Sequence, residues 1–220
     1  MSDTKAENYS ISQENLSINS LAKIEYLLSY NVKLPLIEHY HKTKIEFIII
    51  LDGMQKFYIN SVLHTFYSGD VAIIKPNQLH NAVANSSDNL TEILWFQLDL
   101  SEVENFLSLS GITGREFYKM VASINTRKFQ AEPLFLRNFV TCFKLFSSDN
   151  INNKIKAQGL FVYCLSKLLE TKSALDMLST DIEYAKEYIH LHFDEVIDMD
   201  ILSSKSNLSL SQFKEKFKSQ

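Results

Sequence analysis

The period of the hydrophobic pattern changes once along the chain, near residue 100. Over residues 21–100, short runs rich in β-branched and aromatic residues are separated by turn residues. The runs are LAKIEYLLSY, LPLIEHYH, IEFIIIL, KFYI, VLHTFY, DVAIIK, HNAVA and LTEILWFQL, and the turns include Asp52-Gly53, Asn60-Ser61 and Ser68-Gly69-Asp70. Many short strands at this spacing predict a β-sandwich or barrel over residues 21–100.

Beyond Asp99 the apolar residues recur at helical spacing. Helices are predicted over residues 115–125, 133–146 and 151–171. They make up a helical connector over residues 101–175. In the third helix the apolar side is traced by Ile155, Leu160, Tyr163, Cys164, Lys167 and Leu168. Residues 160–169 are therefore a candidate dimer surface, although the same apolar width suits packing on the barrel.

The two ends of the chain differ from its middle in composition and in hydrophobic pattern. Residues 1–20 are polar and rich in Ser, Asn and Glu, which predicts a flexible arm. Residues 180–220 carry the signals of three short helices. Thr180 with Glu183 and Ser209 with Gln212 form capping boxes, and Asp198 can cap the helix between them. Three helices with a tight polar turn before the third predict a helix-turn-helix.

Composition narrows the classes of protein that fit this pattern. Apolar residues make up 45% and charged residues 22% of the 220 residues, as in ordinary globular proteins. The net charge of -4 means that any DNA binding must use a local basic patch. Without a membrane-spanning run or an apolar signal core, we expect a cytoplasmic protein with no membrane partner. Cys142 and Cys164 are expected to be buried thiols, although the two could pair.

Polar residues that bind metals are concentrated in two segments of the predicted barrel. In EHYHKTKIEFIIILDG, His39 and His41 are two apart on a predicted strand and so point to one face. Glu46 can join that face from the next strand, and GDVAIIKPNQLH supplies His80. Three imidazoles and a carboxylate in one barrel are a sensible ligand set for a first-row divalent metal.

These segments resemble the two motifs of the cupin superfamily. His39, His41, Glu46 and Gly53 fit the first motif at every position, and Gly69, Pro76 and His80 fit the second motif. The second motif lacks its middle glycine and is one residue short between Pro76 and His80. In this form it resembles the sensing domains of AraC-type (AraC/XylS) regulators. The resemblance implies an α+β protein whose cupin-like barrel, of the jelly-roll type, precedes connector helices and a partial helix-turn-helix domain.

The resemblance leaves the chemistry of the barrel open. The four polar residues could bind a divalent metal, line an effector pocket without metal, or close the barrel mouth structurally. Trp95 shares a strand face with Ile93 and Gln97. Trp95 could stack on a sugar or another small polar ligand while Gln97 hydrogen-bonds it, or Trp95 could belong to the core. The predicted effector pocket therefore comprises His39, His41, Glu46, His80, Ile93, Trp95 and Gln97, with no cofactor required.

The last forty residues resemble the first helix-turn-helix of AraC-type regulators. The matching positions are Tyr188-Ile189, His192-Phe193, Leu208-Ser209 and Phe213 to Lys218, whereas Ser203 and Asn207 replace the usual Ala and Gly. The resemblance implies that Ser211, Lys214 and Glu215 face base edges, beside the exposed Gln212, and that Lys216 and Lys218 lie nearer phosphates. Residues 205–220 carry four lysines against Glu215, a net of +3, whereas residues 180–204 carry a net of -6.

The chain ends at Gln220, where the family's first recognition helix would end. The resemblance therefore predicts either a truncated chain or one that lacks the second unit, with weak binding to DNA. The leading hypothesis is a non-enzymatic, homodimeric transcription regulator whose barrel senses a small molecule and controls the helix-turn-helix. The alternatives are a metal-dependent cupin enzyme, such as a dioxygenase or isomerase, and a dimerising partner without working DNA contacts.

Overall fold

The protein forms two units, which are described separately. The structure is a computed structural model that describes residues 7–16, 18–30, 37–83, 90–175, 185, 188–189, 197–206 and 208–219. The first unit is Met1–Lys172 and the second is Ser173–Gln220. The predicted helix-turn-helix segment lies in the second unit.

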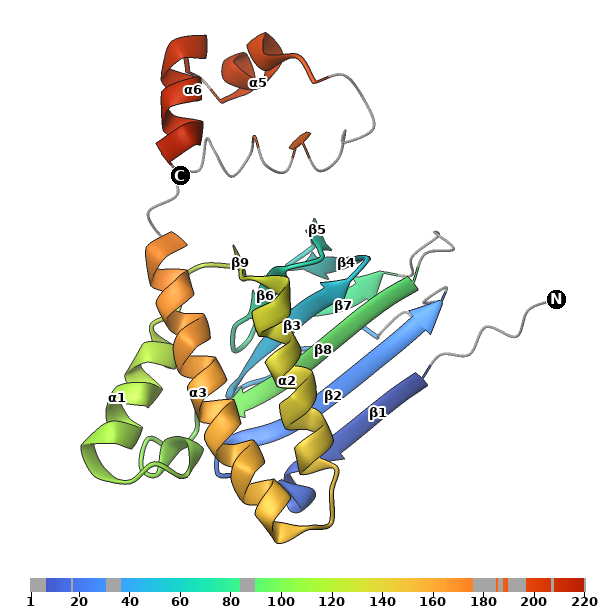
Figure 1. Cartoon of the computed structure of the whole chain (residues 1–220), viewed down its shortest axis with the longest axis vertical. Coiled ribbons are helices and arrows are strands. Elements are labelled where there is room, and N and C mark those ends of the chain that lie inside the picture. Colours follow the sequence, from blue (N-terminus) through green and yellow to red (C-terminus); the bar gives the residue numbers. More distant parts are fainter. Residues whose placement is uncertain are drawn as a thin grey trace, which may run out of the picture. The chain divides into compact units, whose positions relative to one another are not determined.

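The first unit is built on two antiparallel sheets (Figure 1). Its strands are β1 (Glu7–Ser12), β2 (Leu21–Tyr30), β3 (Lys44–Asp52), β4 (Met54–Ile59), β5 (Val62–Tyr67), β6 (Asp70–Ile74), β7 (His80–Val83), β8 (Leu90–Asp99) and β9 (Lys128–Gln130). The larger sheet has the order β1-β2-β8-β3-β6-β9, and the smaller sheet has the order β5-β4-β7. The predicted β-rich architecture is thus confirmed.

Two strands lie outside the predicted barrel boundaries. The prediction of a flexible arm over residues 1–20 was wrong for Glu7–Ser12, which forms β1 and pairs along β2, and for the short 3-10 helix η1 (Gln13–Asn15). At the other edge β9 pairs with β6, so the sheet also recruits residues from the predicted connector. Neither strand has a clear apolar pattern of its own. β1 is stabilised by pairing with β2, which is near in sequence, and β9 by pairing with β6, which is distant.

The turns follow the local sequence. Asn60 and Ser61 both have positive φ angles, 49° and 65°, as a type I′ turn between β4 and β5 requires. Gly53 has a φ of +76°, and a Cβ there would lie 2.4 Å from the Leu90 carbonyl oxygen. Gly53 therefore permits both the turn after β3 and the close approach of β8.

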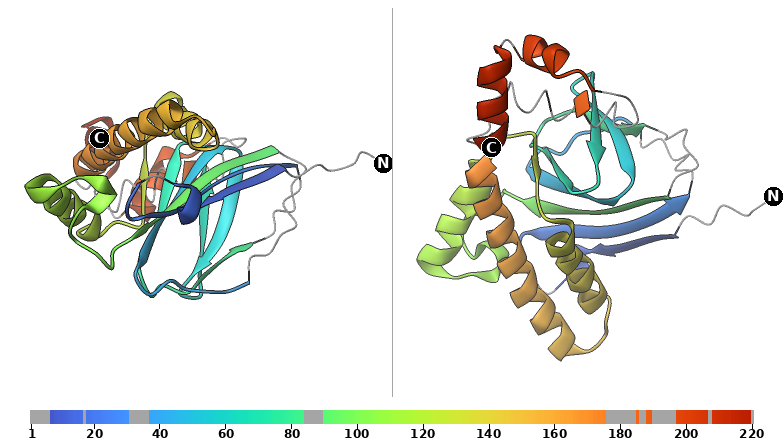
Figure 2. Two further views of the ribbon diagram at one scale, coloured as in Figure 1. Left: turned by 90° about the horizontal axis from the view of Figure 1, so that it is seen from below. Right: turned by 45° about the horizontal axis from the view of Figure 1, so that its top comes forward.

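The two faces of the larger sheet pack against different layers. On the inner face, Ile48, Ile50 and Ile93 pack with residues of the smaller sheet such as Phe57 and Phe66. On the outer face, the ring of Phe96 stacks on Phe47 at 4.8 Å and contacts Phe139 and Phe161 of the helices at 5.5 and 5.0 Å. Figure 2 shows the helices on one side of this sheet and the barrel interior on the other.

The helices of the first unit are η2 (Phe106–Ser108), α1 (Gly111–Ala122), α2 (Pro133–Phe146) and α3 (Ile151–Leu175). The predicted bounds of α2 are confirmed, with Pro133 in the first turn as helices favour. The first predicted helix starts four residues early, at a glycine-containing turn that apolar spacing does not reveal. Among the described helices, none has the length and apolar character needed to cross a membrane.

The proposed dimer surface on α3 is largely buried inside the first unit. Phe161, Cys164, Leu165 and Leu168 have no exposed surface, because this stripe packs under the sheet and α2. The exposed apolar side chains of the helix lie on another face, at Ile151, Ile155 and Tyr163. The alternative of packing on the barrel therefore accounts for this buried stripe, and dimerisation through α3 stays a prediction. Cys142 and Cys164 are free and buried, as expected.

In the second unit, the structure describes two helices, α5 (Met199–Lys205) and α6 (Leu210–Ser219), around a small core. The core is formed by Ala185, Leu202 and Phe213, against which Tyr188, Ile189, Ile197, Leu208 and Phe217 pack. The Asp198 carboxylate accepts a hydrogen bond from the Asp200 amide, and the Ser209 hydroxyl accepts one from the Gln212 amide. Both predicted caps are thus confirmed. The capping box at Thr180 and the turn residue Asn207 lie outside the described residues.

Candidate ligand and metal site

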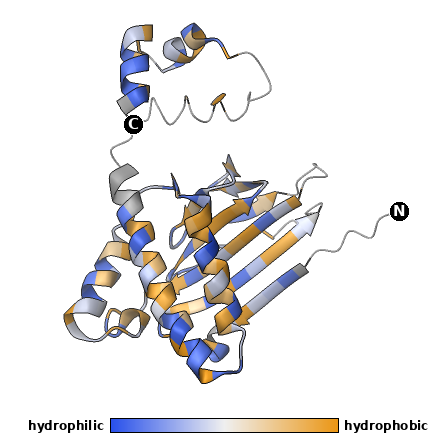
Figure 3. Cartoon of the chain, in the orientation of Figure 1, coloured by the Kyte–Doolittle hydropathy of each residue, from blue (hydrophilic) through white to orange (hydrophobic). Residues whose placement is uncertain are grey.

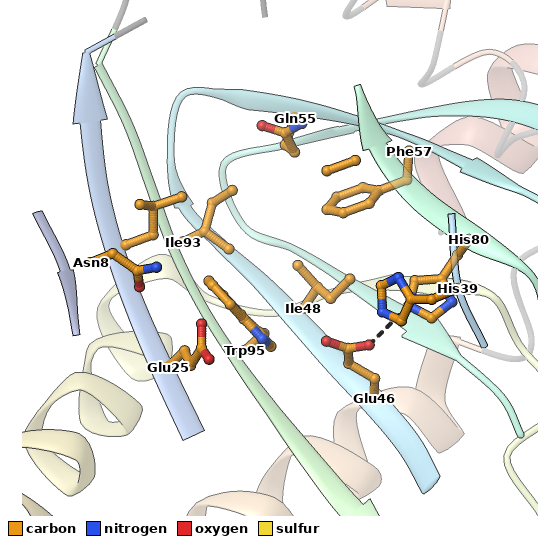
Figure 4. Close-up of a pocket in the computed structure, with 12 residues that line it drawn as sticks. Asn8, Glu25, His39, Glu46, Ile48, Gln55, Phe57, His80, Ile93 and Trp95 are labelled. Carbon is orange, nitrogen blue, oxygen red and sulfur yellow. Dashed lines mark hydrogen bonds and ion pairs between the residues drawn. The ribbon is translucent and has the colours of Figure 1, made fainter. Parts of the chain in front are cut away.

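A cavity of about 110 Å³ lies on the inner face of the larger sheet. Its lining is apolar along the middle, at Leu27, Ile48, Phe57, Ala82, Ile93 and Trp95, and polar at Asn8, Glu25, His39, Glu46, Gln55 and His80. Figure 4 shows Glu46 and the imidazoles gathered on one side of Ile48, with Asn8 and Glu25 beyond Trp95. An apolar cavity with a few convergent polar groups is the usual form of a small-molecule site.

Backbone pairing brings the imidazoles together. His39 forms an isolated antiparallel bridge with His80, in which each amide donates to the other carbonyl at 3.0 and 2.9 Å. The amide of Asn77, in the turn before β7, donates to the His41 carbonyl at 2.7 Å. The ring centroids of His39 and His80 are 4.3 Å apart. The predicted convergence is confirmed, although His39 and His41 do not lie on a regular strand as predicted.

Glu46 is a buried carboxylate that faces two of these imidazoles. Its Oε2 atom lies 3.2 Å from His80 Nε2 and 3.6 Å from His41 Nε2. Burial alone would raise the pKa of Glu46, but hydrogen bonds and charge from His41 and His80 outweigh it and lower the pKa to about 2. Glu46 is therefore ionised at neutral pH.

His80 is the partner most affected by Glu46. Burial lowers the pKa of His80, but the hydrogen bond to Glu46, the carbonyl of Gln78 and the Glu46 charge together raise it above its usual value. Its Nδ1 lies 3.0 Å from the Gln78 carbonyl oxygen, and its Nε2 faces the carboxylate. Because both ring nitrogens then act as donors, this geometry favours the imidazolium form.

The donor set also fits a divalent metal ion. Ligand nitrogens of His39, His41 and His80 lie within 4.8 Å of one another. Nδ1 of His39 lies 2.8 Å from the Ile37 carbonyl oxygen, so a backbone carbonyl orients both this ring and that of His80. Such second-shell carbonyls fix the Nδ1–H tautomer and leave Nε2 free to bind a metal. A metal held by these histidines and Glu46 would replace the proton of the His80–Glu46 pair.

The comparisons with known proteins agree with this geometry. Residues 33–96 match the Cupin domain family. The chain contains a cupin domain. The match ends at residue 96, so the AraC-type resemblance of the later residues stays a prediction. A search of curated protein sequences finds no match.

Several solved structures resemble part of this chain, all of them distantly. A cupin protein from Bacteroides fragilis is 19% identical, with 51% of this chain and 92% of that chain covered and a TM-score of 0.37. A predicted oxalate decarboxylase from Thermotoga maritima is 20% identical, with 43% and 80% covered and a TM-score of 0.36. A Klebsiella pneumoniae protein with a double-stranded β-helix domain is 16% identical, with 45% and 76% covered and a TM-score of 0.36.

Within the cupin domain, five of the seven predicted pocket residues line the cavity. These are His39, Glu46, His80, Ile93 and Trp95. His41 and Gln97 instead lie beside it, where Gln97 Nε2 is 3.1 Å from His41 Nε2. Gln97 is paired with Glu46 across β3 and β8, so its amide supports the imidazole cluster. The prediction that Gln97 and His41 line the pocket was therefore wrong, because the amide nitrogen of Gln97 is turned toward the His41 ring.

The polar side of the cavity formed by β1 and β2 was not predicted from the sequence. The buried carboxylate of Glu25 pairs with Lys23 and accepts a hydrogen bond from the Ser10 hydroxyl at 2.9 Å. Glu25 is opposite Trp95 in the register of β2 and β8, which places both on the inner face. In the sequence, Glu25 is two residues before Leu27, so alternation along a strand places both side chains on the same face. This signal went unused because β1 was not predicted.

Proposed function

We propose that this chain is a ligand-responsive transcription regulator, in which the cupin domain binds a small molecule and the second unit contacts DNA. The observation that carries the proposal is the combination of a cavity-bearing cupin domain with a separate unit of two capped helices. In this proposal the chain is not an enzyme and acts as a homodimer. The exposed apolar face of α3, at Ile151, Ile155 and Tyr163, is the proposed dimer surface.

The cavity supports the sensing half of the proposal. Cavities of about 150 Å³ admit ligands the size of benzene, so this cavity suits a compact molecule of a few heavy atoms. Trp95 offers an aromatic face for stacking, while Glu46 and Glu25 offer acceptors for hydroxyl or amine groups on either side. A polyhydroxy compound of a few carbon atoms, at the small end of the sugars, fits this set. Its binding would act by favouring one arrangement of the domain over another.

The exposed side of α6 supports the DNA-binding half. Ser211, Gln212, Lys214, Glu215 and Lys218 are exposed, Lys216 is half-buried, and the ring of Phe213 is fully buried. Figure 3 shows the predominance of hydrophilic colour along this helix. In the proposal, Ser211, Lys214 and Glu215 face base edges, with Gln212 beside them. Lys216 and Lys218 contact phosphates, which adds sequence-independent affinity.

A DNA-binding experiment tests this function. Fluorescence anisotropy with fragments of the host genome should reveal a preferred fragment whose affinity changes when a ligand extracted from the host is added. Lys218→Gln should weaken binding to all fragments and reduce the slope of log K against log salt by about 1. Lys119→Gln, on α1 of the other unit, is the matched control. Equal binding by both variants and the unaltered chain would contradict the assignment of α6.

The imidazole cluster favours a second candidate function, a metal-dependent cupin enzyme such as a dioxygenase or isomerase. His39, His41, His80 and Glu46 would hold the ion, which would supply Lewis-acid or redox chemistry when bound. Elemental analysis of protein purified from its host distinguishes the two functions. One equivalent of iron, manganese or zinc, lost in His80→Ala but retained in His64→Ala, would favour the enzyme. A stable metal-free protein whose thermal midpoint rises with a small ligand would favour the sensor.

A further inference from the structure

A second, smaller cavity has a different lining from the cavity on the inner face. Its volume is about 90 Å³, and its lining consists of Ile73, Lys75, Gln78, Asn125 and Arg127. Lys75 and Gln78 flank the turn between β6 and β7, whereas Asn125 and Arg127 belong to the segment between α1 and β9. The amide of Ile73 donates to the Arg127 carbonyl at 2.9 Å, which fixes these two parts of the chain side by side.

The side chains around this cavity have already used their acceptor atoms. Oε1 of Gln78 accepts a hydrogen bond from the Lys75 amide at 2.8 Å, and Oδ1 of Asn125 accepts one from Lys75 Nζ at 2.9 Å. Only oxygen can accept from these donors, so the amide nitrogens of Gln78 and Asn125 remain to donate. The Arg127 guanidinium uses Nη1 toward His64 Nε2 at 3.1 Å and retains further N–H groups.

The charge of the cavity is positive. Two of the lining side chains, Lys75 and Arg127, are cations, and none of the lining side chains is acidic. Within the described part of the chain, the ion pairs that the structure forms include neither of these two cations. Two positive charges and several side-chain N–H donors around one small space are suited to an anion with several acceptor oxygens.

We propose that this cavity is a binding site for a tetrahedral oxyanion of the phosphate class. A volume about three times that of one water molecule in the liquid suits a single phosphate group. Donors from Lys75, Gln78, Asn125 and Arg127 converge from two separate segments, which matches four acceptor oxygens better than the two oxygens of a carboxylate. The bound anion joins the turn before β7 to the segment after α1. The two cavities have no lining residue in common.

Calorimetric titration of the full chain with inorganic phosphate, in a chloride buffer of constant ionic strength, tests this site. We expect one saturable site per chain and a phosphate-dependent rise in the thermal midpoint. Arg127→Gln and Lys75→Gln should each raise the phosphate Kd at least about tenfold, because each removes a charge-assisted hydrogen bond. Arg115→Gln is the matched control, because Arg115 is an exposed arginine of α1 that pairs with Glu104. It should change the Kd less than about twofold.

Loss of the phosphate site can be distinguished from loss of folding. Because Arg127 is exposed, Arg127→Gln should fold normally, and circular dichroism without phosphate checks this. Absence of saturable binding, unchanged binding in both cavity variants, or equal weakening in Arg115→Gln would overturn the site. Acetate binding as tightly as phosphate would overturn the tetrahedral class. Within the proposal, glycerol phosphate distinguishes the two sources: equal affinity indicates a phosphorylated small molecule, and weaker affinity indicates free phosphate.

Discussion

The two faces of the larger sheet each bury a carboxylate, yet they use it differently. Glu46, on the inner face, is 5% exposed and faces His80 and His41 beside the cavity. Glu92, on the outer face, is 6% exposed, pairs with Arg137 of α2 and accepts a hydrogen bond from the Tyr26 hydroxyl at 2.7 Å. The two carboxylates are buried to the same extent, so their different roles must come from their different partners.

The outer carboxylate, Glu92, pairs with a side chain that keeps the same charge. An arginine keeps its charge throughout the physiological pH range, so the Glu92–Arg137 pair fixes α2 on β8. The inner carboxylate has imidazole partners, of which His80 has a raised pKa, and it borders a cavity. A buried charge with titratable partners and adjacent space is a candidate site, whereas one with a permanent partner against packed helices is a structural tie.

The largest expected effect comes from breaking the outer packing. Phe96→Ala should lower the free energy of unfolding by about 3–5 kcal/mol, because it leaves a cavity among Phe47, Phe139 and Phe161. Trp95→Ala, the adjacent residue on the opposite face, should cost less because the indole already borders a cavity. Chemical denaturation measures both. A larger cost for Trp95→Ala would contradict the contrast between the faces.

A smaller loss is expected when the outer carboxylate is neutralised. Glu92→Gln should lower the free energy of unfolding by about 1–3 kcal/mol, because hydrogen bonds to a charged group contribute about this much. The loss should be constant between pH 6 and 8, since neither the guanidinium nor the tyrosine hydroxyl changes charge there. Denaturation at several pH values measures it. A loss that varies across this range would show that Glu92 also has a titrating partner.

The inner carboxylate should affect how the free energy of unfolding varies with pH. The raised pKa of His80 contributes stability that is fully present below its unfolded pKa of 6.5 and is lost as pH rises through the folded value. Glu46, with its pKa lowered to about 2, contributes stability above 4.5 that is lost as pH falls through 2. The pair therefore stabilises the fold most between about pH 4.5 and 6.5.

Glu46→Gln should reverse the contribution of His80. Without the carboxylate, burial disfavours the imidazolium, so protonation should destabilise the fold as pH falls below 6.5. The difference between the stability curves of the unaltered chain and Glu46→Gln, measured from pH 5 to 8, isolates this effect. Glu92→Gln serves as the control, with a difference curve that should be flat between pH 6 and 8. Parallel curves for the unaltered chain and Glu46→Gln would exclude the His80–Glu46 pair as a titrating unit.

The sequence predicted those parts of the fold that carry a local pattern. The bounds of β2, β5 and α2 agree with prediction because alternation, turn residues and Pro133 mark them. β1 and β9 were missed, since one is largely polar and the other has three residues, and both depend on a partner strand. The motif spacing predicted that His39, Glu46 and His80 would meet. It could not reveal Glu25, whose place in the cavity depends on long-range register.

The alternation along β8 has a consequence for how this protein can diverge. Ile93 and Trp95 face the cavity, while Leu94 and Phe96 are buried with no exposed surface under the helices. Substitutions at Ile93 and Trp95 would therefore change the lining of the cavity, while Leu94 and Phe96 stay fixed by packing. Under the proposed sensing function, a lineage could thus change its ligand by substitutions on one side of a single strand and retain its helical layer unchanged.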